Sequence, residues 1–326
     1  MAGTANLPSK MPPSSLRSLL TDLIDYAGLF PPAKLSMQAA VETYNRCRIG
    51  EQEWMLGRFI CPLARIAEFE TAASAYMPGT FATSGYREMA DAGEPWRLSV
   101  LVEPRPGNDI QESLDQIHAF NTKHSDERNG WCEIDMLEIK VTSPNHIDPI
   151  LDQIEEGLFP FFEFPVTTDC RGFVAALSGS PAGAKIRTGG IVGDAFPQAS
   201  EVSAFLHACA LGDVAFKATA GLHHPLRGSH RLTYEKESPS CTMHGFLNLF
   251  IAAALVREQR IDDRTTQAVL LEEDPAALKV SEQVLGWKSY LVETAKVAQA
   301  REAFALSFGS CSFEEPVEDL KKLGWM

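Results

Sequence analysis

The sequence predicts a single (β/α)8 barrel of the TIM type. Short apolar runs rich in β-branched and aromatic residues alternate eight times with amphipathic stretches of helical period, which is typical of parallel strands separated by helices. The length of 326 residues suits a barrel that forms one domain. An open doubly wound sheet would share most of this local pattern, but no G-x-G-x-x-G follows the first run, which argues against dinucleotide binding.

Eight apolar runs are expected to form the barrel strands. Each is short and is bounded by turn-forming residues, as strands usually are. The last of them is the least secure, because residues 267–271 could be a strand instead. In chain order the expected strands are residues 23–30, 55–61, 97–103, 134–141, 159–166, 184–188, 214–219 and 305–310.

The stretches between these runs have helical spacing and recognisable starts. Ser36 precedes apolar residues at helical spacing and is expected to be an N-cap, and Ser200 is expected to cap a later helix. Pro144 introduces a helix that is expected to run to Ile154. The apolar run 246–256 is far shorter than the roughly 20 residues of a membrane helix, so it predicts a buried helix.

Composition excludes several kinds of partner. Hydrophobic residues make up 45% of the chain and the formal net charge is -14, which indicates a soluble protein without a general affinity for nucleic acid or anionic membranes. Seven cysteines without C-x-x-C spacing favour reduced thiols and a cytoplasmic location. Residues 1–13 are expected to be a flexible leader, and residues 222–303 to form a lid loop and extra helices that cap the barrel or form a contact in a homo-oligomer.

Charged residues stand where barrel strands are normally apolar. Side chains alternate along a strand, so Glu138 and Lys140 share one face, as do Lys185 and Arg187. Glu163 occupies the matching face of the strand between them. Burying an unpaired charge costs several kcal/mol, so these groups require compensation.

A barrel places the carboxyl ends of its strands at one mouth, where active sites lie. At this mouth the positive charges would outnumber the negative charges of the two glutamates; they belong to Lys140, Lys185, Lys217 and Arg187. This surplus predicts a small anionic substrate with a carboxylate or phosphate group. The competing interpretation is that these residues are solvated rim residues or structural ion pairs.

Two consecutive lysine strands carry a resemblance to a known family. The segments Lys185-Ile186-Arg187-Thr188-Gly189 and Lys217-Ala218-Thr219-Ala220-Gly221 resemble those of class I aldolases of the deoxyribose-phosphate aldolase type. The run from Glu133 to Met136 looks like the fourth-strand segment of that family. The resemblance implies that Lys185 forms a Schiff base with a carbonyl substrate, that Lys217 holds its pKa down, and that Asp135 assists proton transfer.

The chemistry also follows from the residues themselves. A lysine with an ordinary pKa of about 10.4 is protonated and cannot attack a carbonyl, so an imine-forming lysine needs burial and a neighbouring cation. Lys217 and Arg187 could supply that cation, and Glu138 or Glu163 could move protons. The rival assignment makes Lys217 the nucleophile, because it carries the fuller K-x-T-x-G pattern.

Several other residues are expected to bind the substrate. These are Arg187, Thr188 and Thr219 at the strand ends, His223 and His224 after the seventh strand, Arg227 in the lid loop, and Gly309 and Ser310, whose backbone could cradle a phosphate. The alternative for the segment of Gly309 and Ser310 is that it binds no phosphate and that Ser312 caps the final helix.

No metal site or cofactor is expected. Adjacent histidines in an extended chain point to opposite sides, so the pair His223-His224 is weak evidence for metal ligands. Cys61 and Cys311 are expected to be small buried hydrophobes, because nothing nearby in sequence activates either.

The sequence therefore predicts a lyase or aldolase that acts on a small anionic carbonyl compound through a lysine imine. Two alternatives stay open. One is a metal-assisted or cofactor-free isomerase or hydrolase that uses the glutamates and a histidine, and the other is a barrel that binds a metabolite without catalysis.

Overall fold

A computed structural model describes residues 11–79 and 94–326. Eight parallel strands close into a barrel in the order β1-β13-β7-β6-β5-β4-β3-β2. Each of the eight overlaps a strand expected from sequence, so the predicted barrel is confirmed, although β1 and β5 are shorter than expected. The barrel strands are β1 (Ile24–Tyr26), β2 (Leu56–Pro62), β3 (Trp96–Val102), β4 (Cys132–Lys140), β5 (Phe159–Glu163), β6 (Gly183–Arg187), β7 (Ala215–Thr219) and β13 (Ala305–Ser310).

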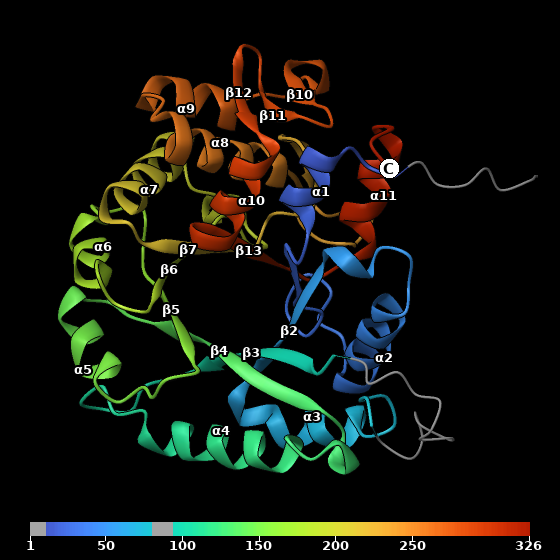
Figure 1. The fold of residues 1–326 in the computed structure, drawn as a ribbon, viewed down its shortest axis with the longest axis vertical. Coiled ribbons are helices and arrows are strands. Elements are labelled where there is room, and N and C mark those ends of the chain that lie inside the picture. The colour runs from blue at the N-terminus through green and yellow to red at the C-terminus, as the bar shows by residue number, and fades with distance from the viewer. Residues whose placement is uncertain (1–10, 80–93) are drawn as a thin grey trace, which may run out of the picture.

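Helices surround these strands on the outside (Figure 1). Residues 267–271, the alternative to the last strand, lie largely in helix α9, because the strand position is taken by β13 between β7 and β1. The helices are α1 (Ser14–Leu20), α2 (Met37–Arg48), α3 (Ile66–Ala73), α4 (Gln111–His124), α5 (Ile147–Leu151), α6 (Arg171–Leu177), α7 (Ala199–Gly212), α8 (Phe246–Gln259), α9 (Asp263–Leu270), α10 (Thr294–Ala303) and α11 (Glu314–Lys322).

The long connection between β7 and β13 forms two small antiparallel sheets as well as helices. One is the hairpin β8 (Gly228–Arg231) with β9 (Ser240–Met243), and the other joins β10 (Leu278–Val280), β11 (Val284–Trp287) and β12 (Tyr290–Glu293). In Figure 1 the second sheet lies beside α8, α9 and α10 at the top of the view. Helix α8 is buried over most of its length, as the apolar run predicts. None of the helices in residues 11–79 and 94–326 combines the length and the apolar character that crossing a membrane requires.

Helix starts show where the sequence patterns succeed and fail. The Ser36 side chain accepts a hydrogen bond from the Ala39 amide, so this predicted N-cap is confirmed. Ser200 is not a cap, because α7 begins one residue earlier and the side chains of Gln198 and Glu201 form a reciprocal capping box. The predicted helix after Pro144 is shorter than expected, since α5 ends at Leu151.

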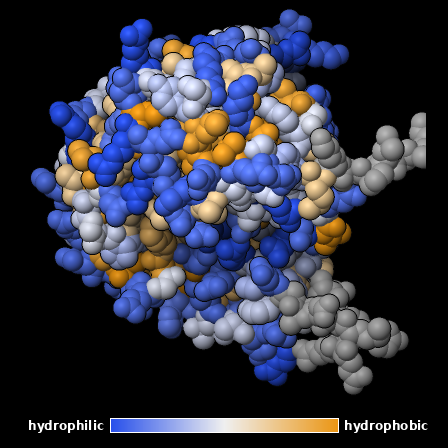
Figure 2. Space-filling model, turned by 45° about the horizontal axis from the view of Figure 1, so that its top comes forward, coloured by the Kyte–Doolittle hydropathy of each residue, from blue (hydrophilic) through white to orange (hydrophobic). Residues whose placement is uncertain are grey.

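The core lies between the outer faces of the strands and the helices. Phe59 of β2 packs on Tyr44 of α2 and Phe69 of α3, and Phe216 of β7 packs on Phe205 of α7 in the same way. Truncating such a buried ring costs about 3–5 kcal/mol, so these contacts hold the strands in register. On the face shown in Figure 2, mostly hydrophilic residues surround smaller groups of hydrophobic residues.

Candidate active site

A row of alternating charges runs through the barrel interior. Lys185 Nζ lies 2.6 Å from Glu163 Oε2 and 2.7 Å from Glu138 Oε2. The other oxygen of Glu138 lies 2.5 Å from Lys217 Nζ, which is also 2.7 Å from Asp25 Oδ2. Arg187 extends the row at its exposed end, with Nε 3.3 Å from Glu163 Oε1. These contacts compensate charges whose burial in barrel strands would otherwise cost several kcal/mol.

The register of the barrel brings these groups together. Lys185 stands opposite Lys217 in β7 and opposite Glu163 in β5, and their side chains point inward with the same period of two. The outward neighbours of Glu138, Leu137 and Ile139, are fully buried against the helices. The alternation predicted for these strands is therefore confirmed.

Polar side chains complete the inner end of the row. Ser99 Oγ donates to Glu138 Oε1 at 2.7 Å, and Ser307 Oγ donates to Asp25 Oδ2 at 2.7 Å. The Arg58 backbone amide donates to Asp25 Oδ1 at 2.7 Å. Because Asp25 and Lys217 have no exposed surface, these hydrogen bonds replace the water that both charges lose.

The charges hold one another ionised. Burial would raise the pKa of Glu138, but Lys185 and Lys217 outweigh it and hold that pKa well below its ordinary value. Burial would lower the pKa of Lys217, but Asp25 and Glu138 outweigh it and raise that pKa above its ordinary value. Lys217 is therefore held in its charged form by Asp25 and Glu138.

A cavity of about 260 Å³ opens at the carboxyl ends of the strands. Lys185 lines it, and Lys217 lies beneath, out of contact with solvent. Among the residues expected from sequence, the lining includes Glu138, Lys185, Arg187, Thr219, His223 and Gly309. The cavity thus collects one lysine, one carboxylate and two cationic or basic side chains at the mouth of the barrel.

Asp25 was not selected from sequence. An aspartate between the apolar residues Ile24 and Tyr26 of the first strand is the same anomaly as a lysine in the sixth, so the signal was present. The expected local surplus of positive charge is wrong for the buried row, because Asp25 adds a third carboxylate against Lys185, Lys217 and Arg187. Ser99 carries no such signal, since serine in a strand is ordinary.

Two of the expected catalytic residues are placed elsewhere. Asp135 binds Arg58 with both carboxylate oxygens, at 2.6 and 2.5 Å, so the structure pairs it with a guanidinium and not with a lysine. Lys140 stands in register with Glu163, but its side chain is exposed. The role implied for Asp135 thus lacks the contact that proton transfer requires.

Several expected substrate-binding residues have structural partners instead. Thr188 Oγ1 donates to the Ala220 carbonyl at 2.6 Å and joins the ends of β6 and β7. Arg227 pairs with Glu273 and donates its amide to Asn248, so it faces α8 and the segment after α9. Ser310 Oγ donates to the Ser312 carbonyl.

Of the two adjacent histidines only one lines the cavity, and Ser312 before α11 has a structural partner. His224 Nδ1 lies 2.6 Å from Asp319 Oδ2 and its ring stacks on His230, whereas His223 lines the cavity. Ser312 Oγ accepts from the Glu315 amide at 3.1 Å, which supports the capping interpretation of this segment. Within residues 11–79 and 94–326, no three His, Cys, Asp or Glu side chains are grouped so that they could hold a metal ion.

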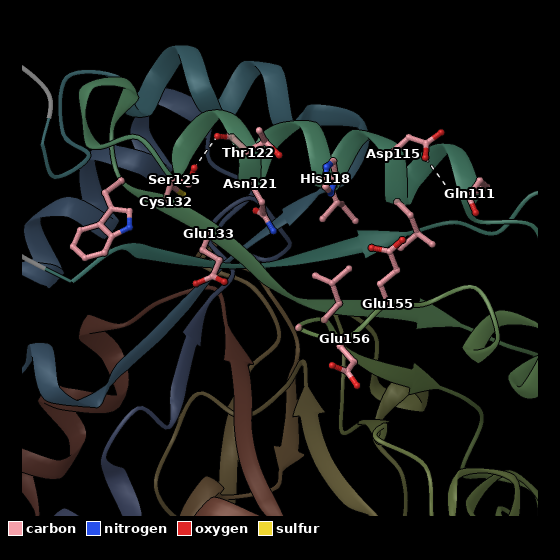
Figure 3. Close-up of a pocket in the computed structure, with 15 residues that line it drawn as sticks. Gln111, Asp115, His118, Asn121, Thr122, Ser125, Cys132, Glu133, Glu155 and Glu156 are labelled. Carbon is pink, nitrogen blue, oxygen red and sulfur yellow. Dashed lines mark hydrogen bonds between the residues drawn. The ribbon is translucent and has the colours of Figure 1, made fainter.

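A larger hollow of about 820 Å³ lies along α4, beside the amino ends of β4 and β5 (Figure 3). It is bounded by α4, the first residues of β4 and the segment before β5, and Asp115, Glu133, Glu155 and Glu156 make its lining acidic. Asn121 points from α4 toward the sheet, where its amide binds the Ile134 amide and carbonyl. Chemistry in these barrels takes place at the carboxyl ends of the strands, so the smaller cavity is the candidate active site.

Fold and site together define an eight-stranded parallel α/β barrel with a buried row of alternating charges at the carboxyl ends of its strands. Comparisons of the chain with protein-family models, with curated proteins and with solved structures return no match.

Proposed function

We propose that the chain is a class I lyase of the aldolase type, which acts on a small anionic carbonyl compound through an imine on Lys185. One observation carries this proposal: Lys185 lines the cavity between two carboxylates, while Lys217 is buried beneath it and shares Glu138 with it. Lys185 can reach a substrate and Lys217 cannot. This favours Lys185 over the rival assignment.

Glu163 is the better proton acceptor for Lys185. Glu138 already binds both lysines and accepts from Ser99, so protonating it would leave Lys217 with less counter-charge. Glu163 sits nearer the mouth, with 12% of its side chain exposed. When Lys185 passes its proton to Glu163, the free amine attacks the carbonyl carbon and a C–N bond forms. The oxygen takes one proton from the nitrogen and one from Glu163 and leaves as water, so the imine is protonated.

The imine then acts as an electron sink for breaking or forming a carbon–carbon bond. Lys217 keeps its positive charge on the far side of Glu138, which draws the negative charge of that carboxylate away from Lys185. This contact is how Lys217 would favour the neutral amine, a role the resemblance to class I aldolases also implies. At the end of the cycle one water adds to the protonated imine, its two protons go to the nitrogen as the carbonyl re-forms, and the Lys185 ammonium is restored.

Two cations support an anionic substrate. Arg187 lines the cavity with 53% of its side chain exposed. Burial opposes the charge of His223, but Cys311 and Glu315 outweigh it and raise its pKa to about 10, so the imidazole is positively charged at neutral pH. A carboxylate or phosphate between these two groups would orient the carbonyl toward Lys185.

The proposal extends to the cellular compartment, a lid over the cavity and the oligomeric state. The seven cysteines are free, as in a reducing cytoplasm. The hairpin of β8 and β9 reaches the end of β13 through Tyr234, which suits a lid in residues 222–303. Of the leader expected in residues 1–13, residues 1–10 lie outside the described residues. We propose a homo-oligomer as the working state.

Borohydride trapping tests the reaction. The full chain is incubated with a panel of small phosphorylated and carboxylated aldehydes, ketones and 2-oxo acids, reduced, and digested for mass mapping. We expect an adduct on Lys185 that Lys185→Met abolishes. Lys123→Met is the control, because this exposed lysine lies on the outer helix α4 and does not line the cavity, so its replacement should not affect trapping.

The other outcomes separate the alternatives. An adduct on Lys217 that survives Lys185→Met would establish the rival assignment. Metal-dependent turnover without any adduct would establish the metal-assisted isomerase or hydrolase. Thermal stabilisation by a ligand without turnover would establish a metabolite-binding barrel, because a ligand that prefers the folded state raises its stability.

A further inference from the structure

A thiol and an imidazole meet in the wall of the same cavity. Cys311 directly follows β13, and His223 follows β7, the neighbouring strand. The Sγ atom lies 3.9 Å from Nδ1 of His223, and both residues line the cavity. They are 88 positions apart in sequence, so the closure of the barrel alone makes them neighbours. Cys311 is buried, as expected from sequence, but the fold places an imidazole beside it that lies far away in the chain.

An acid and a phenol complete this cluster. Glu315 of α11 places Oε2 3.3 Å from the same Nδ1, and the Tyr234 hydroxyl lies 3.6 Å from Sγ and 3.4 Å from Glu315 Oε2. The imidazole nitrogen thus lies between a sulfur and a carboxylate. A carboxylate beside a histidine favours the imidazolium, and a cation beside a sulfur stabilises a thiolate.

Other titratable groups surround the cluster. His224 Nε2 lies 3.9 Å from Glu315 Oε1, and its Nδ1 binds Asp319 of α11. His230 of β8 stacks on His224, and burial and the charge of His224 lower the pKa of His230. His223 thus faces one carboxylate directly and a second one beyond His224, which supports a positive charge beside Cys311.

We propose that Cys311 and His223 form a second nucleophilic centre in this cavity, which adds reversibly to the carbonyl carbon of a small aldehyde. The sulfur forms a C–S bond, the carbonyl π electrons move to oxygen, and His223 gives that oxygen a proton. The net change adds S–H across C=O and yields a thiohemiacetal, so no oxidant or second reactant is needed. Glu315 positions and charges His223. This centre does not depend on Lys185 and goes beyond the proposed lyase activity.

Alkylation of the full chain by iodoacetamide tests the thiol. Each cysteine is followed by mass mapping in the folded chain and in the urea-unfolded chain. A small buried hydrophobe reacts more slowly when folded, whereas we expect Cys311 to react roughly tenfold faster in the folded chain. Cys241, which is half-buried and on β9, is the internal reference. Slower alkylation of Cys311 in the folded chain would overturn the proposal, and this comparison needs no variant.

Variants then assign the roles of the partners. His223→Gln should remove the excess rate and move the pH profile of Cys311 alkylation up to that of an ordinary thiol. Glu315→Gln should move that pH profile to lower pH, because the imidazolium loses its carboxylate. Cys241→Ser is the matched control and should leave the Cys311 rate unchanged. An unchanged pH profile in folded His223→Gln would contradict the pairing of thiol and imidazole.

Competition by propanal tests addition to an aldehyde. We expect propanal to slow Cys311 alkylation reversibly, both in the wild-type chain and in Lys185→Met, where no imine can form on that lysine. Loss of the protection in Lys185→Met would mean that the aldehyde binds only through Lys185, and the addition to Cys311 would be wrong. Protection in both chains without borohydride adducts on Lys185 would instead refute the proposed lyase and retain this centre.

Discussion

Lys185 and Lys217 contact opposite oxygens of one carboxylate, that of Glu138, from paired positions on adjacent strands. The two amines are therefore closer together than the screening length of about 10 Å, so solvent ions do not screen their charges from each other. The two lysines differ in access to solvent: Lys185 faces the cavity, whereas Lys217 faces the closed interior of the barrel.

Replacement of the shared carboxylate should destabilise the barrel strongly. Glu138→Gln leaves two buried ammonium groups with one full carboxylate each, and breaking a buried ion pair from one side costs about 3–5 kcal/mol. Chemical denaturation followed by circular dichroism measures the loss. The control is Glu133→Gln on the same strand, an exposed residue whose replacement should change the unfolding free energy by less than about 0.5 kcal/mol. Equal losses in both variants would contradict the shared pairing.

A methyl group at Gly57 should displace Asp25. A Cβ atom at this position would stand 2.4 Å from Asp25 Oδ1 and 3.2 Å from the Asp22 carbonyl. Since overpacking costs about 1–3 kcal/mol, Gly57→Ala should lower the thermal midpoint and reduce trapping at Lys185. Gly172→Ala in α6 is the matched control, because its Cβ would meet its nearest atom at 3.4 Å and alanine favours helix by about 1 kcal/mol. A stable Gly57→Ala variant with unchanged trapping would show that Asp25 does not need its present position.

The charge of His223 should make stability depend on pH. The folded-state pKa of about 10 lies above the unfolded value of about 6.5. A raised pKa stabilises the fold fully below the unfolded value, and that contribution decreases as pH rises from about 6.5 to 10. The unfolding free energies of the wild type and His223→Gln should therefore differ most at low pH and converge at high pH. Over this range their difference should decrease by on the order of a few kcal/mol. A difference that stays constant over this range would refute the raised pKa.

The hydrogen bonds of Arg301 should be important for holding the start of β13 in place. This buried guanidinium donates to the carbonyl oxygens of Leu19, Thr21, Ala305 and Leu306, so it joins the end of α1 to β13. Arg301→Met leaves these acceptors unpaired, and each buried unsatisfied group costs about 1–3 kcal/mol. We expect a large fall in the urea midpoint, whereas the exposed neighbour Glu302→Gln should leave it unchanged. A similar midpoint in both variants would mean that water replaces the guanidinium.

The local pattern predicted the strands better than the site. Alternation along β4 and β6 placed Glu138 and Lys185 on inward faces correctly, because the period of two is a property of any extended chain. The cap of α7 was misassigned to Ser200, since Gln198 and Glu201 also form a capping pair and single-residue preferences do not rank the two. Asp25 on the first strand is a buried charge of the same kind as those on the fourth to seventh strands, but no second charge in the short strand β1 marks it as part of a row.

The sequence by itself determined the eight strands, their inward and outward faces, and the presence of charges that needed partners, since each of these depends on neighbours along the chain. Only the tertiary structure decided which charge binds which. Closure of the barrel sets β1 beside β13 and β13 beside β7, and so brings Asp25 to Lys217 and Cys311 to His223. These contacts join residues far apart in the chain, and their energies fall off over a few ångströms, so no local pattern could specify them.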